Sequence, residues 1–178
     1  MRLFIAIELP DAVKQTLGRL RTEIPGARWV VPDQLHLTLA FLGETDQETA
    51  QSLTTKLADI QARGFDLRFG STGCFPDKRR PRVVWIGFEP EPLLQKLAAL
   101  VRAAVLASGI PQEERPFSPH ITLARLRAPA SIAGFPDGPV AISSVPVREF
   151  TLFESRLTSS GAIHTAIRSF GLLDPPLE

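Results

Sequence analysis

The amino-acid sequence predicts an α+β fold of two pseudo-symmetric lobes, each a mostly antiparallel sheet with helices outside, around a central cleft. The main observation is a repeat: residues 36–42 read HLTLAFL and residues 120–126 read HITLARL, with five of seven positions identical at an offset of 84 residues. Each copy follows an extended segment and then an amphipathic helical segment. A length of 178 residues suits one domain or one duplicated domain. We therefore predict a single bilobal domain over residues 1–178, built on the His-x-Thr-Leu repeat at 36–39 and 120–123.

The first half of the chain is predicted to begin with a strand and a helix. Residues 2–9 (RLFIAIEL) are apolar and β-branched and end at a proline, which is typical of a strand. Apolar side chains recur at helical spacing over residues 11–24, which predicts a helix closed by a Pro-Gly pair. Residues 28–31 and 35–42 read as two extended segments.

A second helix is predicted directly after the first heptapeptide. Thr45 and Glu48 have the spacing of a capping box, and apolar residues follow at helical intervals. Residues 65–69 alternate as a strand does. We predict that the segment after it, with Cys74 and the basic run Lys78-Arg79-Arg80, is a loop.

The second half repeats the order of strand, helix and strand. Residues 82–88 read as a buried strand, and Pro92 suits the first turn of a helix that ends at Gly109. The apolar stripe of this helix is predicted to comprise Leu93, Leu97, Leu100 and Ala104. The remaining predicted elements are a strand at 117–126, a Pro/Gly-rich loop at 128–146, and a closing hairpin of residues 147–157 and 162–172.

Composition narrows the class of protein. The balance of 20 basic against 19 acidic residues argues against a protein that coats duplex nucleic acid, which would carry a strong basic excess. Sixteen of the 20 basic residues are arginine. That bias follows either from a genome rich in G and C or from planar contacts to phosphates and bases, which lysine does not imitate. Only the positions of the arginines can decide between these explanations.

The same composition predicts a cytoplasmic protein. The single cysteine, Cys74, has no partner for an internal disulfide and fits a reducing compartment. No apolar run approaches the roughly 18 residues of a membrane span, and the N-terminus lacks the features of a secretory signal. We expect a monomer with no membrane partner.

Two of the three histidines begin the repeated heptapeptides. In a strand, residues i and i+2 share a face, so we expect His36 and Thr38 on one face, together with Ala40 and Leu42. The second copy places His120 and Thr122 on one face in the same way. Two such copies in a duplicated frame favour a functional role over a structural one.

A pair of histidines suits a displacement at phosphorus. Imidazole titrates near pH 6.5, so one ring can act as a neutral base while the other acts as a charged acid. The threonine hydroxyls, about 6–7 Å further along each strand, could bind the non-bridging phosphate oxygens. Neither heptapeptide contains an Asp or Glu that would hold a metal. The sequence thus predicts acid–base chemistry on a phosphate, with no cofactor and no metal.

The two HxTL motifs, their separation and their strand–helix frame resemble the two-histidine (2H) phosphoesterase superfamily, and within it the LigT-like RNA 2′,3′-cyclic phosphodiesterases. The resemblance covers nearly the whole chain, from residues 2–9 through Arg28-Trp29 and Val84-Trp85 to the C-terminal hairpin. It implies a two-lobed α+β fold with the four motif residues in the central cleft. It also implies metal-independent hydrolysis of RNA 2′,3′-cyclic phosphate ends and small cyclic nucleotides to 2′-phosphomonoesters. Some relatives are also credited with 2′–5′ RNA ligation.

This resemblance also assigns roles to the motif residues. It makes His36 the general acid on the departing 3′-oxygen and His120 the general base on water, although the symmetry of the repeat leaves the reverse assignment open. Thr38 and Thr122 then bind the phosphate.

Two further residues are brought in by the resemblance. Phe41 and Arg125 each lie five residues after their histidine and match the pair that sandwiches the nucleobase. In a regular strand an odd offset points both away from the histidine face. The assignment therefore requires the chain to bulge, twist or end near Ala40 and Ala124.

Three alternatives remain open at this point. One is a non-catalytic module that binds RNA ends, and another is a 2H phosphoesterase for a different cyclic phosphate, such as ADP-ribose 1″,2″-cyclic phosphate. The third is a zinc hydrolase that uses His36, His120 and His164, which metal analysis and activity in a chelator would reveal. Outside that alternative, we expect His164 at the surface or hydrogen-bonded, rather than in contact with the site. The run Lys78-Arg79-Arg80, with Arg82, is either a contact for the RNA backbone or a solvated loop.

Overall fold

The computed structural model describes residues 1–177, which form two four-stranded sheets, one small two-stranded sheet and three α-helices. The elements are β1 (Arg2–Glu8), α1 (Asp11–Gly18), β2 (Ala27–Trp29), a 3-10 turn (Pro32–Gln34), β3 (His36–Glu44), α2 (Gln47–Ala58), β4 (Phe65–Leu67), β5 (Phe69–Phe75), β6 (Val83–Phe88), α3 (Pro92–Ala107), β7 (His120–Leu126), β8 (Val145–Val147), β9 (Glu149–Thr158) and β10 (Gly161–Gly171). This arrangement confirms the predicted two-lobed α+β fold.

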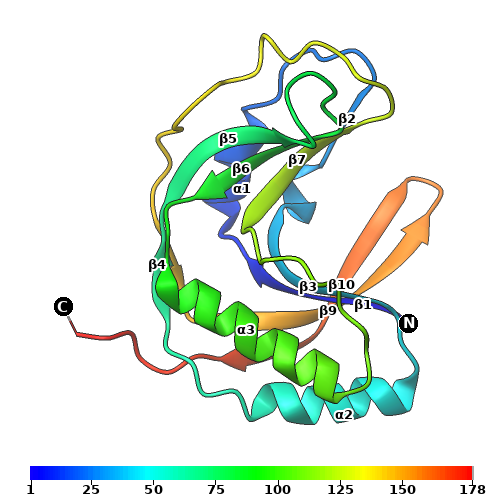
Figure 1. The fold of residues 1–178 in the computed structure, drawn as a ribbon, viewed down its shortest axis with the longest axis vertical. Helices are drawn as coiled ribbons and strands as arrows, with labels where there is room; N and C mark the ends of the chain where they lie inside the picture. Colours follow the sequence, from blue (N-terminus) through cyan, green and yellow to red (C-terminus); the bar gives the residue numbers. More distant parts are fainter. Residues whose placement is uncertain (178) are drawn as a thin grey trace.

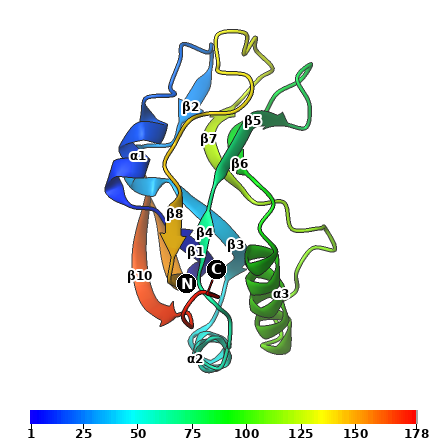
Figure 2. The ribbon, with the colours of Figure 1, turned by 90° about the vertical axis from the view of Figure 1, so that its left-hand side faces the viewer.

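Each large sheet contains strands from both halves of the chain. The first sheet has the order β10-β9-β1-β3 and the second the order β2-β7-β6-β5, with every pair antiparallel. Figure 1 shows the two sheets one above the other, with α2 and α3 beneath the first. The small β4–β8 sheet runs between them, as Figure 2 shows. The two lobes are therefore interleaved rather than successive along the chain.

The main hydrophobic core extends through both sheets. It includes Ile5 and Leu37 of the first sheet, Ile86 and Ile121 of the second, and Leu97 of α3, all essentially inaccessible to solvent. Burial of such side chains is the main favourable contribution to folding. Because this core is continuous, it fixes the two motif strands, β3 and β7, relative to each other. Within residues 1–177, no helix is long and apolar enough to cross a membrane.

Both helices of the first half differ from their predictions. Helix α1 ends at Gly18 rather than continuing to residue 24. A Cβ at position 18 would lie 3.0 Å from the ring of Pro32, so the helix ends where that proline approaches it. Ile24 is still buried, but it lies in the loop after the helix. Helix α2 is capped by Asp46, whose carboxylate accepts a hydrogen bond from the backbone N–H of Thr49 at 2.8 Å. The capping box predicted from Thr45 is wrong because the Thr45 N–H is bonded to the carbonyl of Met1.

The buried stripe of α3 is also rotated from the predicted one. Leu97 and Ala104 are buried as expected, but Leu93 and Leu100 are only half-buried, and Leu94 and Val101 fill the core in their place. The helix itself begins at Pro92, as predicted.

Strand β5 extends to Phe75, through a segment that the sequence predicts as a loop. Its sequence, FGSTGCF, has no alternation of apolar and polar residues. Gly73 explains part of this composition, because a Cβ at this position would overlap the indole ring of Trp85. Glycine within a strand commonly marks such a close approach.

We expect Gly73→Ala to destabilise the protein by about 1–3 kcal/mol, since the added methyl group forces the Trp85 indole out of its packed position. Urea unfolding monitored by far-UV circular dichroism measures the change. Gly134→Ala is the control, because nothing lies within 4 Å of a Cβ there. Equal stability of the two variants would contradict this description of the Trp85 contact.

Candidate active site

The two heptapeptides form equivalent strands in the two sheets. His36 is the first residue of β3 and His120 the first residue of β7, and these two strands contact each other. In both strands the histidine and the threonine are half-buried, and the side chains that alternate with them, Leu37 and Leu39 in the first copy, are buried. Each histidine therefore shares a face with its threonine, which we call the histidine face of each strand.

Both imidazole rings are held by the same hydrogen bond. The Nδ1 atom of His36 lies 2.7 Å from the carbonyl oxygen of Gln34, and that of His120 lies 2.8 Å from the carbonyl oxygen of Ser118. A carbonyl oxygen only accepts, so Nδ1 carries the hydrogen in both rings. The Nε2 atom of each ring remains to take up or release a proton.

The threonine hydroxyls are free to bind a ligand. Among residues 1–177, neither Thr38 nor Thr122 makes a side-chain hydrogen bond to another protein group, and both side chains are half-buried rather than enclosed. A hydroxyl offers one donor and two acceptor lone pairs, so it suits a phosphate oxygen.

A bulge reverses the alternation in both motif strands. In the first sheet Ala6 pairs with Thr38 and Ile5 with Ala40, which leaves Leu39 without a partner. In the second sheet Trp85 pairs with Thr122 and Val84 with Ala124, which leaves Leu123 unpaired at the equivalent position. An extra residue of this kind changes the face to which the next side chains of the strand point.

The bulges bring Phe41 and Arg125 to the histidine face. Phe41 is 67% exposed, and its ring lies 6.5 Å from that of Phe4, which in turn lies 4.9 Å from the His36 ring. Arg125 is exposed and stands opposite Arg28 of β2. The structure thus contains the irregularity that the nucleobase assignment required. The expectation that Ala40 and Leu42 share the histidine face is wrong, because the bulge turns both into the core.

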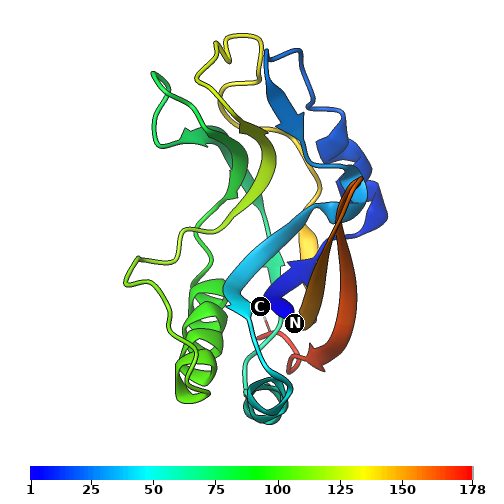
Figure 3. The same cartoon turned by 90° about the vertical axis from the view of Figure 1, so that its right-hand side faces the viewer.

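His164 lies against His36, contrary to its predicted place at the surface. The two rings are 5.3 Å apart with edge-to-face geometry, and both contact Phe4. The β9–β10 hairpin, which carries His164, reaches the 3-10 turn before β3, as Figure 3 shows, and the side-chain amide of Gln34 donates to the carbonyl of Ala162. Sequence periodicity gave no signal for this contact, because β10 and β3 are not neighbours in the sheet.

The environment of His36 disfavours its charged form. Its pKa is lowered to about 4, mainly by burial and also by the nearby His164, whereas the hydrogen bond to Gln34 and the charge of Glu8 act in the opposite direction. Burial also lowers the pKa of His164. Glu8 stands opposite His36 in the sheet and is ion-paired with the buried Lys14 at 2.9 Å. In the free protein at pH 7 the His36 ring is therefore neutral.

His120 has different neighbours. Its ring makes an edge-to-face contact with Phe75 at 5.1 Å and lies 6.3 Å from Trp85. Neither neighbour titrates, so the second motif lacks the imidazole pair found in the first. The two histidines share a hydrogen bond and differ in their surroundings.

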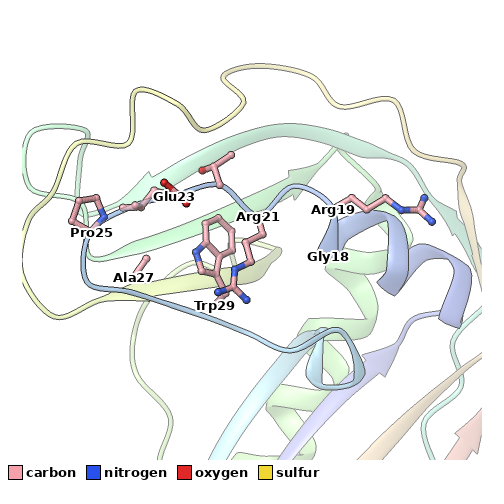
Figure 4. Close-up of a pocket in the computed structure, with 9 residues that line it drawn as sticks. Gly18, Arg19, Arg21, Glu23, Pro25, Ala27 and Trp29 are labelled. Atoms are coloured by element: carbon pink, nitrogen blue, oxygen red, sulfur yellow. The ribbon is translucent and has the colours of Figure 1, made fainter.

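Within residues 1–177, no three His, Cys, Asp or Glu side chains are grouped so as to hold a metal ion. The three histidines of the zinc alternative therefore do not form a ligand set. A separate groove of about 770 Å³ lies between the end of α1 and β2 and is lined by Arg19, Arg21 and Trp29 (Figure 4). None of its lining residues belongs to either motif.

Comparisons with known proteins agree with this geometry. A family model described as LigT like Phosphoesterase matches the chain over residues 7–85 and again over residues 86–164. RNA 2′,3′-cyclic phosphodiesterases from Thermus thermophilus and Escherichia coli are 39% and 38% identical to it; the alignments cover 97% and 96% of this chain, and 90% and 96% of the relatives. The crystal structure of E. coli LigT complexed with 3′-AMP superimposes with a TM-score of 0.85 at 36% identity, over 96% of this chain and 97% of that one.

We expect His164→Phe to raise the pKa of His36. Phenylalanine keeps the ring and the burial but removes the imidazolium charge that disfavours protonation of its neighbour. The titration of the His36 ring, followed by NMR, should shift to higher pH than in the wild type.

Thr165→Ala is the matched control. Thr165 is exposed and directly follows His164 in β10, so its side chain points to the face of the sheet opposite to that of His164. An unchanged pKa of His36 in His164→Phe, or the same shift in the control, would show that His164 does not act on His36.

Proposed function

The chain belongs to the LigT-like phosphoesterase family, and on that basis we propose that it is an RNA 2′,3′-cyclic phosphodiesterase. It is a hydrolase that opens 2′,3′-cyclic phosphate ends to 2′-phosphomonoesters. The observation that carries the proposal is the pair of histidines on adjoining strands, each with Nδ1 bonded to a carbonyl and Nε2 left for proton transfer. Thr38 and Thr122 bind the non-bridging oxygens of the phosphate between them.

The reaction needs two proton transfers and no metal. The Nε2 atom of His120 takes a proton from water as the water oxygen attacks phosphorus. The bond from phosphorus to the 3′-oxygen breaks, and Nε2 of His36 donates a proton to that oxygen. The products are a 2′-phosphate and a free 3′-hydroxyl. With the 5′-hydroxyl of a second RNA in place of water, the same steps would form a 2′–5′ linkage.

This assignment requires His36 to carry a proton that it lacks in the free protein. A cyclic phosphate bears a negative charge, and an opposite charge within about 4–6 Å favours the protonated form of a histidine. We therefore propose that binding of the substrate raises the pKa of His36 from about 4 and so charges the acid. A bound RNA end would then switch on the group that protonates its own leaving oxygen.

A pure binding module explains the site less well. Recognition of a phosphate calls for hydrogen-bond donors, which the two threonines and Arg125 supply. It does not call for two imidazoles fixed in the same tautomer. We further propose that the protein acts in the cytoplasm as a monomer, since one chain carries both motifs and its single cysteine, Cys74, is compatible with a reducing compartment.

We expect the protein to convert 2′,3′-cyclic AMP to 2′-AMP in the presence of a chelator, with the product identified by chromatography. His36→Ala and His120→Ala should each reduce turnover by about 10²–10⁴ while the fold is retained. No turnover by the wild type, or a 3′-phosphate product, would contradict the proposal. Loss of activity in the chelator would contradict its metal independence.

The roles of the two histidines are separated in the same assay by a substrate with sulfur in place of the bridging 3′-oxygen. A thiolate leaves without protonation, so His36→Ala should recover most of its activity on this substrate, whereas His120→Ala should not. Recovery in His120→Ala alone would reverse the assignment.

Phe41 and Arg125 are proposed to hold the nucleobase between an aromatic ring and a guanidinium plane. Phe41→Ala and Arg125→Ala should each weaken binding of 2′-AMP by about 1–3 kcal/mol, measured by calorimetry. Arg125→Lys keeps the charge without the plane and should lose the stacking part.

Ribose 2′,3′-cyclic phosphate, which has no base, is the control substrate. It should be hydrolysed equally by the wild type and Phe41→Ala. An equal loss on both substrates would mean that Phe41 does not contact the base.

A further inference from the structure

One end of the second sheet carries six arginines, which we call the arginine end. They are exposed and come from three separate segments: Arg28, Arg79, Arg80, Arg82, Arg125 and Arg127. Arg28 lies on β2, and the next three lie in the connection between β5 and β6. Arg125 is near the end of β7, and Arg127 directly follows that strand. Of the six, only Arg125 has a role in the proposed reaction, as a contact for the nucleobase.

The strand pairing brings these segments together. Arg28 pairs with Arg125 across β2 and β7, and Val83 pairs with Arg125 across β6 and β7. The main chain of Arg82 bonds on one side to Phe75 of β5 and on the other to Leu126 of β7. Its guanidinium also donates to the carbonyl of Arg127. Figure 1 shows β2 and the β5–β6 connection at the same end of this sheet.

Carboxylates do not neutralise this end. Among residues 1–177, none of the six arginines forms an ion pair. Of the acidic side chains in the adjoining loops, Asp77 accepts the backbone N–H groups of Arg79 and Arg80 at 2.8 and 3.0 Å, and Asp137 is paired with Lys78 at 3.1 Å. The whole chain has a formal net charge of only +1, so this positive charge is a local feature.

Like charges gathered at one end of a sheet repel one another and do not stabilise the fold. An anion with several charges would relieve that repulsion. Guanidinium groups also bind phosphate through two parallel hydrogen bonds, which a lysine cannot do. Arginines at these positions are therefore suited to bind an anion that carries several phosphates.

We propose that the arginine end binds the RNA strand on the 5′ side of the terminal nucleotide. The proposal rests on the proposed function, which puts the cyclic phosphate at the histidines and the terminal base beside Arg125. The sheet order β2-β7-β6-β5 puts Arg28 on one side of Arg125 and the β5–β6 connection on the other. An RNA strand that leaves this position toward β6 meets that connection, which carries Arg79 and Arg80. The protein would thus bind RNA ends more tightly than mononucleotides, through interactions with the RNA backbone that do not depend on sequence.

The test compares a fluorescein-labelled single-stranded RNA that ends in a 2′-phosphate with 2′-AMP, which ends in the same group. The variant Arg79→Gln/Arg80→Gln changes two arginines that lie outside the proposed catalytic and base-binding groups. Its affinity for the RNA, measured by fluorescence anisotropy, should fall by about tenfold. The slope of log affinity against log salt concentration should become shallower by about 0.7 for each phosphate that the variant no longer binds. Its affinity for 2′-AMP and its turnover of 2′,3′-cyclic AMP should stay within about twofold of the wild type.

Arg19→Gln/Arg21→Gln is the matched control, because these exposed arginines line the separate groove of Figure 4. The proposal would be overturned if Arg79→Gln/Arg80→Gln bound RNA with the same affinity and the same salt slope as the wild type. It would also be overturned if the control lost as much RNA affinity as this variant. Binding of polyglutamate through Arg79 and Arg80, without binding of RNA, would also overturn it and indicate an acidic protein partner.

The RNA-binding test can fail or succeed independently of the test for hydrolysis of cyclic AMP. A wild type that does not hydrolyse cyclic AMP, but binds RNA through Arg79 and Arg80, would support the RNA surface and refute the hydrolase. A wild type that hydrolyses cyclic AMP, with RNA binding unaffected by the double substitution, would refute the RNA surface alone.

Discussion

The structure of the site depends on the pairing of each motif strand with its neighbour and on the bulge that directly follows the threonine in each pairing. Strand β3 pairs with β1, and β7 with β6, and in both pairs the residue directly after the threonine has no partner. The bulge lets one strand present a histidine, a threonine and a third side chain on one face, while the leucines between them stay in the core. A regular strand would bury Phe41 or expose Leu42, so the irregularity is what makes three functional positions compatible with one buried face.

Equal motifs acquire unequal chemistry from the strands around them. The hydrogen bond from Nδ1 is the same for His36 and His120, and its acceptor is a carbonyl two residues earlier in each case. The neighbours differ, because the first sheet is extended by the β9–β10 hairpin with His164, and the second by β5 with Phe75. A duplicated pair of imidazoles can therefore serve one acid and one base, as a displacement at phosphorus needs.

Interleaving of the halves gives the site its rigidity and its surroundings. Strand β2, from the first half, completes the second sheet, and β9 and β10, from the second half, complete the first. The same exchange puts Arg28 beside Arg125 and Gln34 against Ala162, so each half of the chain holds groups that surround the other half's motif. The arrangement of the strands is shared with E. coli LigT, which has the same fold. The contact of His164 and the arginine end are observed in the structure of this chain.

The repeated heptapeptide, and the alternation of buried and exposed side chains along a strand, are local properties of the sequence. The fold class, the family and the two His-x-Thr pairs were therefore predictable from the order of residues. Phe41 and Arg125 reach the histidine face only if alternation breaks near Ala40 and Ala124, and the order of residues does not show whether it breaks. A bulge is defined by the partner strand, so this answer had to come from the paired sheets. The contact of His164 with His36 and the depressed pKa of His36 also emerge only from packing. Both depend on distance and burial between segments far apart in the chain, which sequence spacing does not encode.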